Sequence, residues 1–168
     1  MSTRCNIIIH HGASKIMLYR HYDGYLANTG ADLAEKFAAA NGSADAFLRA
    51  LMADRYDKAS YETEARPVYE LTTEVHGDIE YLYKVVFPAR GGNSGVDKPE
   101  IGYSERHNFE DFDTGWAAGP IMGPLADFTA SVNTAIRQAN RRLDELKRGD
   151  NAKHFASYEP QAELTISQ

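Results

Sequence analysis

The chain has 168 residues, of which 43% are hydrophobic and 25% are charged, and its formal net charge is −6 at pH 7. This composition indicates one soluble globular domain, and it excludes a transmembrane helix, which needs about eighteen or more consecutive apolar residues. The acidic balance also excludes a protein that coats extended nucleic acid, because such binding requires a basic face. A small nucleotide-sized anion remains possible, since a few arginines suffice to bind it.

The first predicted element is a β-hairpin. Residues 4–10 and 15–20 are two apolar strands separated by a turn at residues 11–14. Cys5, Ile7 and Ile9 share one face of the first strand. Cys5 is the only cysteine and has no partner for a disulfide or a metal pair, so we expect it to be a small buried hydrophobe.

The second strand runs into the segment Tyr-Arg-His-Tyr-Asp-Gly-Tyr at residues 19–25, hereafter the signature stretch. It combines three phenols, a guanidinium, an imidazole and a carboxylate with a glycine that favours a sharp turn. A loop fixed at the end of a strand is a good position for a ligand site. We therefore expect ligand contacts from five of its side chains: Arg20, His21, Tyr22, Asp23 and Tyr25.

Two helices are predicted after the signature stretch. Thr29, with Asp32 three residues later, is expected to cap a helix that ends near Asn41, where Gly42 favours a left-handed stop. Ser43 is expected to cap a second, short helix.

A second hairpin is predicted further along the chain. Residues 67–75 and 79–87 alternate in polarity, and His76, Gly77 and Asp78 between them are typical turn residues. Residues 88–119 then lack regular periodicity. Within them, the glycines at 91, 92 and 95 lack the lysine of a P-loop. The segment is either a plain surface loop or a mobile loop that holds an anion, with Arg90 and Asn93 as donors.

The last predicted helix begins at Pro124 and stops at Gly149. Its apolar residues recur every three or four positions, at Leu125, Phe128, Val132, Ala135, Ala139, Leu143 and Leu146. This stripe is longer than the core of a small domain requires, so we expect part of it to pack on a second copy of the chain. The alternative is a long helix lying across its own sheet.

Together these elements predict an α+β fold, in which an antiparallel sheet built from two hairpins packs against two short helices and one long C-terminal helix. We expect residues 1–149 to form a single domain and residues 150–168 to form a tail or arm. The first residues lack the long apolar stretch of a secretory signal, so we expect a cytoplasmic protein.

One alternative interpretation is a metal-assisted hydrolase. The His-x-Asp spacing occurs twice, as His21 with Asp23 and as His76 with Asp78. Four such side chains meeting at one point would form a metal site. The spacing alone is also ordinary turn chemistry, and we expect no bound metal and no cofactor.

Residues 3–7, 19–25, 69–73 and 77–83 resemble segments of small proteins encoded by bacteriophages and prophages. In particular, the first 87 residues are similar to the anti-Thoeris sponge family, non-enzymatic proteins that sequester cyclic ADP-ribose-type immune signals in pockets between subunits. The resemblance implies a homo-oligomer in the host-cell cytoplasm, with an aromatic platform for adenine and arginines for the pyrophosphate. By type and position, Phe87, Arg90, Asn93 and Arg106 are the candidates for these contacts.

The resulting hypothesis is a phage anti-defence protein that binds a nucleotide immune signal without cleaving it. The signal would be of the cyclic ADP-ribose type or a cyclic oligonucleotide. Besides the hydrolase, a second alternative is an acidic protein that binds and inhibits a host defence complex.

Overall fold

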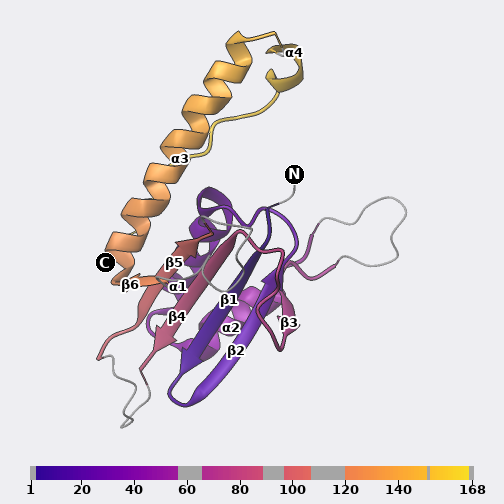
Figure 1. The fold of residues 1–168 in the computed structure, drawn as a ribbon. Helices are drawn as coiled ribbons and strands as arrows, with labels where there is room; N and C mark the ends of the chain where they lie inside the picture. Colours follow the sequence, from indigo (N-terminus) through magenta and orange to yellow (C-terminus); the bar gives the residue numbers. More distant parts are fainter. Residues whose placement is uncertain (1–2, 57–65, 89–96, 107–119, 151, 167–168) are drawn as a thin grey trace.

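A six-stranded mixed sheet forms the centre of the computed structural model, which describes residues 3–56, 66–88, 97–106, 120–150 and 152–166 (Figure 1). The strand order is β3-β2-β1-β4-β5-β6, and every neighbouring pair is antiparallel except β1 and β4, which are parallel. The α+β class expected from the sequence is therefore confirmed. The strands are β1 (Cys5–His11), β2 (Ser14–Arg20), β3 (Glu70–Thr72), β4 (Tyr81–Phe87), β5 (Glu100–Glu105) and β6 (Ile121–Gly123).

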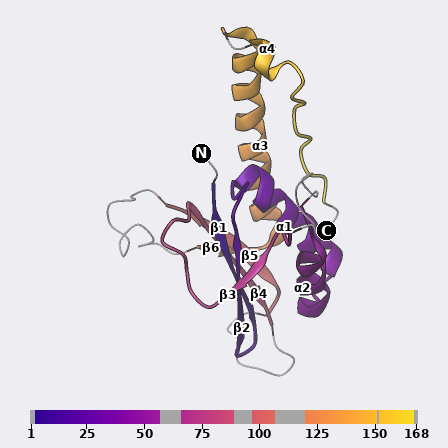
Figure 2. The same ribbon diagram turned by 90° about the vertical axis from the view of Figure 1, so that its right-hand side faces the viewer.

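The helices are a π-helical turn η1 (Leu26–Gly30), α1 (Ala31–Ala40), α2 (Ala44–Ala53), the long α3 (Leu125–Arg148) and the single turn α4 (Ala152–Phe155). Figure 2 shows α1 and α2 on one side of the sheet. The described residues contain no helix with both the length and the apolar character needed to cross a bilayer.

The first hairpin is confirmed. β1 pairs with β2 in the register that places Ile7 opposite Leu18, and Gly12 adopts a positive φ of 60° in the turn. Cys5 and Ile7 are fully buried and Ile9 nearly so, in the core that the sheet forms with the helices. The period-two pattern of residues 4–20 thus predicts both the strands and the buried face correctly.

The prediction of a second hairpin is wrong, and with it the fully antiparallel sheet. β3 keeps only three residues and pairs with β2, whereas β4 pairs with β5 on one side and runs parallel to β1 on the other. The predicted turn is a crossover: the His76 backbone N–H donates to the buried Asn6 Oδ1 at 2.8 Å, and the Glu80 N–H donates to the Arg4 carbonyl at 2.9 Å. Alternating polarity identifies strands but does not choose their partners.

β5 and β6 lie where the sequence predicts no strand. In β5, Gly102 stands between Ile101 and Tyr103, and its lack of a side chain is required because a Cβ there would collide with the Ile121 carbonyl of β6. A glycine inside a strand marks such a close backbone approach, but it also weakens the sequence signal.

The two short helices form as predicted, with one correction. Ser43 caps α2, because its Oγ accepts the Ala46 N–H at 3.2 Å, and Asn41 ends α1 in the left-handed conformation. Thr29 does not cap a helix. It is fully buried within η1, and its hydroxyl donates to the Asp23 carbonyl at 2.7 Å.

α3 divides into two halves. Phe128, Val132 and Ile136 are buried in the main core, whereas Ala139 is exposed and Leu143 is half-buried. Figures 1 and 2 both show the C-terminal half projecting beyond the sheet, with the final segment of the chain returning beside it. The alternative in which α3 lies across its own sheet therefore holds for its first half.

Candidate functional site

The strand that carries the signature stretch directs Arg20 toward the helices. Its Nε donates to the Tyr22 carbonyl at 2.8 Å, one terminal nitrogen donates to the Tyr69 hydroxyl at 3.0 Å, and its cation lies 5.3 Å from the centre of that ring. The Tyr69 hydroxyl in turn donates to the Asp32 carboxylate. Arg20 is thus part of a structural network and not a free phosphate ligand.

Burial and charge keep this network in one protonation state. Burial, followed by the Asp32 carboxylate, raises the pKa of Tyr69 well above its usual value, so the phenol stays protonated. For Arg20, burial lowers the pKa, but the Tyr69 and Tyr56 phenols outweigh it and the net shift is upward. Lys36 completes the charge balance through ion pairs with Asp32 and Asp54. All these groups are therefore paired around the fully buried Tyr69 ring, while the Lys36, Asp32 and Asp54 side chains stay partly exposed.

Asp23 and Gly24 shape the turn of the signature stretch. Asp23, not the glycine, adopts the left-handed conformation, with φ 57°. Gly24 is required for another reason: a Cβ there would lie 2.7 Å from the Arg4 carbonyl carbon, so only glycine lets the loop pass so close to β1. The Gly24 carbonyl accepts a hydrogen bond from the Tyr83 hydroxyl at 2.9 Å, which joins the loop to the middle of β4.

Among the predicted site residues, His21 lines a pocket formed by the described part of the chain. This pocket has a volume of about 410 Å³. Its lining includes one tyrosine, two histidines and two acidic residues: Tyr19, His21, His76, Glu70 and Asp78. The Tyr19 ring is stacked on His76 at 4.1 Å and meets His21 edge-on at 4.6 Å, while its hydroxyl lies 3.3 Å from the Asp78 carboxylate oxygens.

The hydrolase set does not assemble there. Asp23 is absent from the lining of this pocket, and Asp78 pairs with Arg4 at 2.7 Å. Within the described ranges, no three His, Cys, Asp or Glu side chains lie close enough together to hold a metal ion. Tyr22 and Tyr25 are exposed, and Tyr22 contacts Tyr56 edge-on at 6.0 Å.

Two further predicted contacts are corrected by burial. Phe87 is 1% exposed and packs in the core against Phe37 and Phe47, with ring centres 5.5 and 5.6 Å away, so it offers no stacking face to a ligand. Arg106 is 6% exposed and donates to the Gly77 carbonyl at 2.6 Å, which ties the crossover to the end of β5. Arg90 and Asn93 lie outside the described residues.

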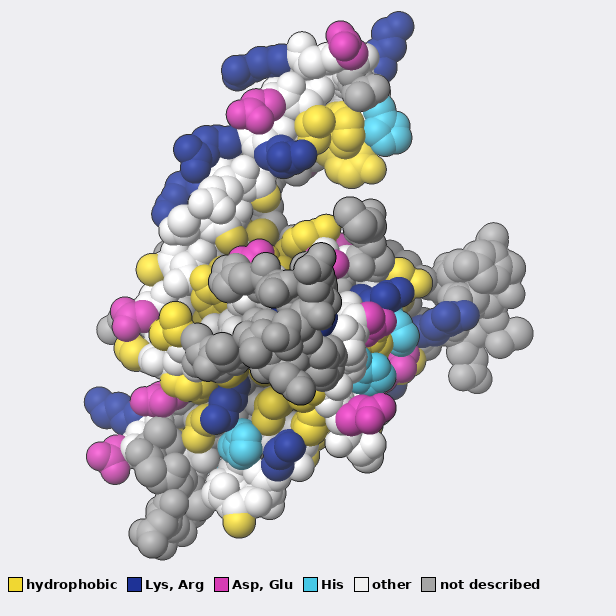
Figure 3. All heavy atoms as spheres, in the orientation of Figure 1, with side chains coloured by type: hydrophobic (Ala, Val, Ile, Leu, Met, Phe, Trp, Pro, Cys, Tyr) yellow, Lys and Arg dark blue, Asp and Glu magenta, His cyan; other side chains and the backbone are white. Residues whose placement is uncertain are grey.

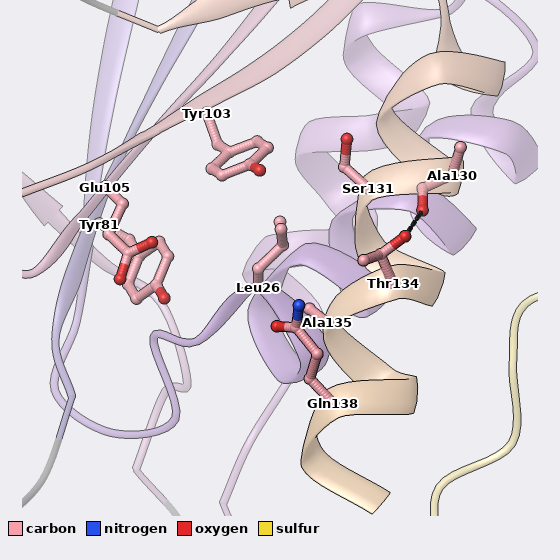
Figure 4. A pocket seen from close by; sticks show the side chains of 9 residues that line it. All are labelled: Leu26, Tyr81, Tyr103, Glu105, Ala130, Ser131, Thr134, Ala135 and Gln138. Atoms are coloured by element: carbon pink, nitrogen blue, oxygen red, sulfur yellow. Dashed lines mark hydrogen bonds between the residues drawn. The ribbon is translucent and has the colours of Figure 1, made fainter. Parts of the chain in front are cut away.

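A second pocket lies where α3 leaves the sheet, and we call it the tyrosine pocket (Figure 4). Its volume is about 400 Å³, within the range of sites for small ligands. In Figure 4, Tyr81 and Tyr103 of the sheet face the side chains of α3, with Leu26 of η1 between them. The remaining lining residues are Glu105, Ala130, Ser131, Thr134, Ala135 and Gln138.

Strand pairing explains why the two tyrosines are held in place. Tyr103 lies opposite Tyr83 in the ladder between β4 and β5, and Tyr81 lies opposite Glu105. Tyr83 is fully buried, its ring centre lies 6.1 Å from that of Tyr81 and 6.5 Å from that of Tyr103, and Phe128 supports it edge-on from α3. Because the Tyr83 hydroxyl is bound by Gly24, the signature stretch supports the wall of the pocket rather than lining it.

The polar groups of the tyrosine pocket include both donors, the Tyr81 and Tyr103 phenols and the Gln138 amide, and acceptors. The Thr134 hydroxyl donates to the Ala130 carbonyl at 2.9 Å and accepts from a terminal nitrogen of Arg137 at 2.9 Å. The Ser131 hydroxyl donates to the Asp127 carbonyl at 3.2 Å, which leaves its oxygen lone pairs to accept. Glu105 adds a carboxylate. Burial first, and Glu105 second, raise the pKa of Tyr81, so its phenol remains protonated. Such a site favours a planar ligand that carries hydroxyl or amino donors.

Among the residues that the structure describes, the lining of the tyrosine pocket contains no lysine or arginine. Arg137 lies at its edge, because one terminal nitrogen donates to the Thr134 hydroxyl at 2.9 Å while the other pairs with Glu163 at 2.6 Å. Further along α3, Arg141 and Arg142 follow Gln138 by three and four residues and are exposed. A phosphate would therefore lie toward the projecting half of α3 and away from the Glu105 carboxylate.

No protein-family model, no curated protein and no solved structure matches this chain.

Sequence reasoning misses the tyrosine pocket because its two sides are far apart in the chain. Alternating polarity assigns Tyr81 to the apolar face of a hairpin, and Tyr103 falls in a region without a predicted strand. One signal is present: Ser131, Thr134 and Gln138 form a polar row beside the apolar stripe of α3 at helical spacing.

Proposed function

We propose that this protein is a non-enzymatic binding protein that takes a small nucleotide-type ligand in the tyrosine pocket and withholds it. The observation that carries the proposal is the pair of braced tyrosine rings facing a polar helix across about 400 Å³. Aromatic rings stack on a nucleobase, and each stacked base contributes about 1–3 kcal/mol in single-stranded nucleic-acid sites. No metal or nucleophile is required for this function.

The polar groups suit the rest of a nucleotide. A carboxylate at the rim of a site can accept both hydroxyls of a ribose, as acidic residues do in dinucleotide-binding folds. Glu105 is the group in that position. The exposed guanidinium groups of Arg141 and Arg142 would take the phosphates. The resemblance of the first 87 residues makes a cyclic ADP-ribose-type immune signal the first ligand to test, and a phage protein acting in the host cytoplasm the first biological role.

Mass spectrometry tests this proposal whatever the identity of the bound nucleotide. Protein purified from bacteria that produce the signal is denatured by heat, and the released small molecules are compared with an added standard. A binding protein returns the nucleotide intact, whereas a hydrolase returns fragments. In parallel, a panel of cyclic ADP-ribose isomers and cyclic oligonucleotides should raise the melting temperature increasingly with ligand concentration. Failure of every member of the panel, with no nucleotide released, would overturn the proposal.

A further inference from the structure

The last segment of the chain binds α3 through its main chain. Residues 159–166, hereafter the strap, run beside α3. Asn133 donates to the Leu164 carbonyl at 3.1 Å and accepts the Leu164 N–H at 2.8 Å. Asn140 repeats this arrangement with the carbonyl and the N–H of Gln161, at 2.8 and 2.9 Å. Each asparagine therefore pairs with both main-chain groups of one strap residue.

The spacing of these contacts shows that the asparagines of α3 are placed to match an extended segment of chain. Seven residues of helix span about 10.5 Å, and three residues of extended chain span about 10 Å. Asn133 and Asn140 are seven apart and their targets are three apart, so an extended segment meets both asparagines in register. Arg137 lies between them and pairs with Glu163 at 2.6 Å.

The strap is also anchored to the body of the molecule. The Gln161 side chain donates to the Ala27 carbonyl of η1 at 2.8 Å, and Leu164 and Ile166 pack against the main core. These contacts use only groups that every copy of the chain carries at the same positions. A strap from a second copy would make the same bonds in the same groove.

The route to the strap leads away from the body. The half of α3 beyond Asn140 projects past the sheet. The described residues of the connection after it form the single turn α4 and are mostly exposed (Figures 1 and 2). The two leucines of this half, Leu143 and Leu146, belong to neither hydrophobic core cluster of the described residues. An arm that extends beyond its own body and ends in a docking segment is suited to exchange between identical copies.

Charge favours a second copy as the partner. Residues 137–155, hereafter the arm, hold six Lys or Arg and three Asp or Glu, so the arm carries +3 and the rest of the chain −9. Figure 3 shows the Lys and Arg side chains along the projecting part of α3. The arm of one molecule is therefore attracted to the acidic body of another.

We propose that the strap is exchanged between two copies, so that residues 161–164 of one chain occupy the Asn133 and Asn140 groove of the other. This interface borders the tyrosine pocket, because Arg137 of the groove also donates to the Thr134 hydroxyl at 2.9 Å, and it uses main-chain recognition rather than the apolar stripe of α3.

Cysteine cross-linking tests the exchange with the full chain. Asn140→Cys and Gln161→Cys are placed on separate, co-expressed copies, and the native Cys5 does not interfere because it is fully buried. Mild oxidation should give a band at twice the 18.7 kDa chain mass on a non-reducing gel, and reduction should remove it. The matched control is Arg141→Cys with Gln161→Cys. Position 141 follows Asn140 in α3 and is therefore rotated by about 100° around the helix axis, away from the strap. Each single variant alone gives the background.

Two results would overturn the proposal. The first is a dimer band no stronger than in the Arg141→Cys control, together with a disulfide that forms only when both substitutions, Asn140→Cys and Gln161→Cys, are on one chain. The second is a mass of one chain for the unmodified protein in light scattering at tens of micromolar. If the strap is exchanged, the variant Asn133→Ala with Asn140→Ala should instead shift the measured mass from two chains toward one while its circular dichroism stays unchanged.

Discussion

The Arg20, Tyr69 and Asp32 network predicts a large stability loss from a single oxygen atom. Tyr69→Phe removes a hydroxyl that donates to Asp32 and accepts from Arg20, in a side chain with no exposed surface. Both partners are charged, and hydrogen bonds to charged groups contribute about 1.5–3 kcal/mol each. Lys36 still pairs with Asp32, so we expect the free energy of unfolding to fall by about 3 kcal/mol rather than by the full sum.

Thermal and urea unfolding would measure this loss. For a chain of this length, about 3 kcal/mol lowers the melting temperature by about 6–12 °C. The matched control is Tyr22→Phe, which removes the same atom from a ring that is 54% exposed and should change stability by less than about 0.5 kcal/mol. Equal, small effects of the two substitutions would refute the assignment of the signature stretch to a structural network.

Three further predictions concern the core, the alkaline limit and the arm. Phe87→Ala should lower the free energy of unfolding by about 3–5 kcal/mol, as expected for a core aromatic ring, whereas a ligand-stacking residue would lose affinity at normal stability. Burial raises the pKa of the Cys5 thiol from 9.0 to about 12, so the folded state holds a proton that the unfolded state loses. The free energy of unfolding should therefore fall between about pH 9 and pH 12, by up to about 1.4 kcal/mol per pH unit. A thiol reagent at pH 8 should label Cys5 only after the protein unfolds. Rapid labelling of the folded protein would contradict this prediction. Ala139→Glu should leave the melting temperature within a few degrees, because position 139 is exposed. If the stripe of α3 also contacts a second copy, the same variant should lower the mass measured by light scattering. Val132→Glu should unfold the chain, because Val132 is fully buried.

Local patterns in the sequence predict those features that depend on neighbouring residues. The first hairpin, the cap at Ser43, the stop near Asn41 and the buried face of Cys5, Ile7 and Ile9 all follow from period and turn chemistry, and all are present. The helix stripe also predicts α3, although its first half packs on its own sheet.

Features that depend on distant pairing are not predictable in the same way. Residues 79–87 do contain a strand, but its parallel pairing with β1 depends on the crossover that Asn6 and Arg4 bind by hydrogen bonds to main-chain groups. The same rearrangement buries Phe87 and Arg106 and brings Tyr81 beside Tyr103. The residue types of the signature stretch correctly indicate a dense set of interacting groups. Its guanidinium, however, is bound within the fold by Tyr69, whereas Tyr22, Asp23 and Tyr25 are exposed.

The measurement that tests the central claim most directly is calorimetry of a cyclic ADP-ribose-type ligand with three forms of the protein. The unmodified chain should bind, and Tyr103→Leu should weaken binding by about fivefold to a hundredfold, because loss of a stacked ring costs about 1–3 kcal/mol. The matched control, Tyr158→Leu, removes an exposed ring on the strap side of the molecule and should bind like the unmodified chain. Equal affinity of the unmodified chain and Tyr103→Leu, at equal melting temperature, would show that the ligand does not occupy the tyrosine pocket.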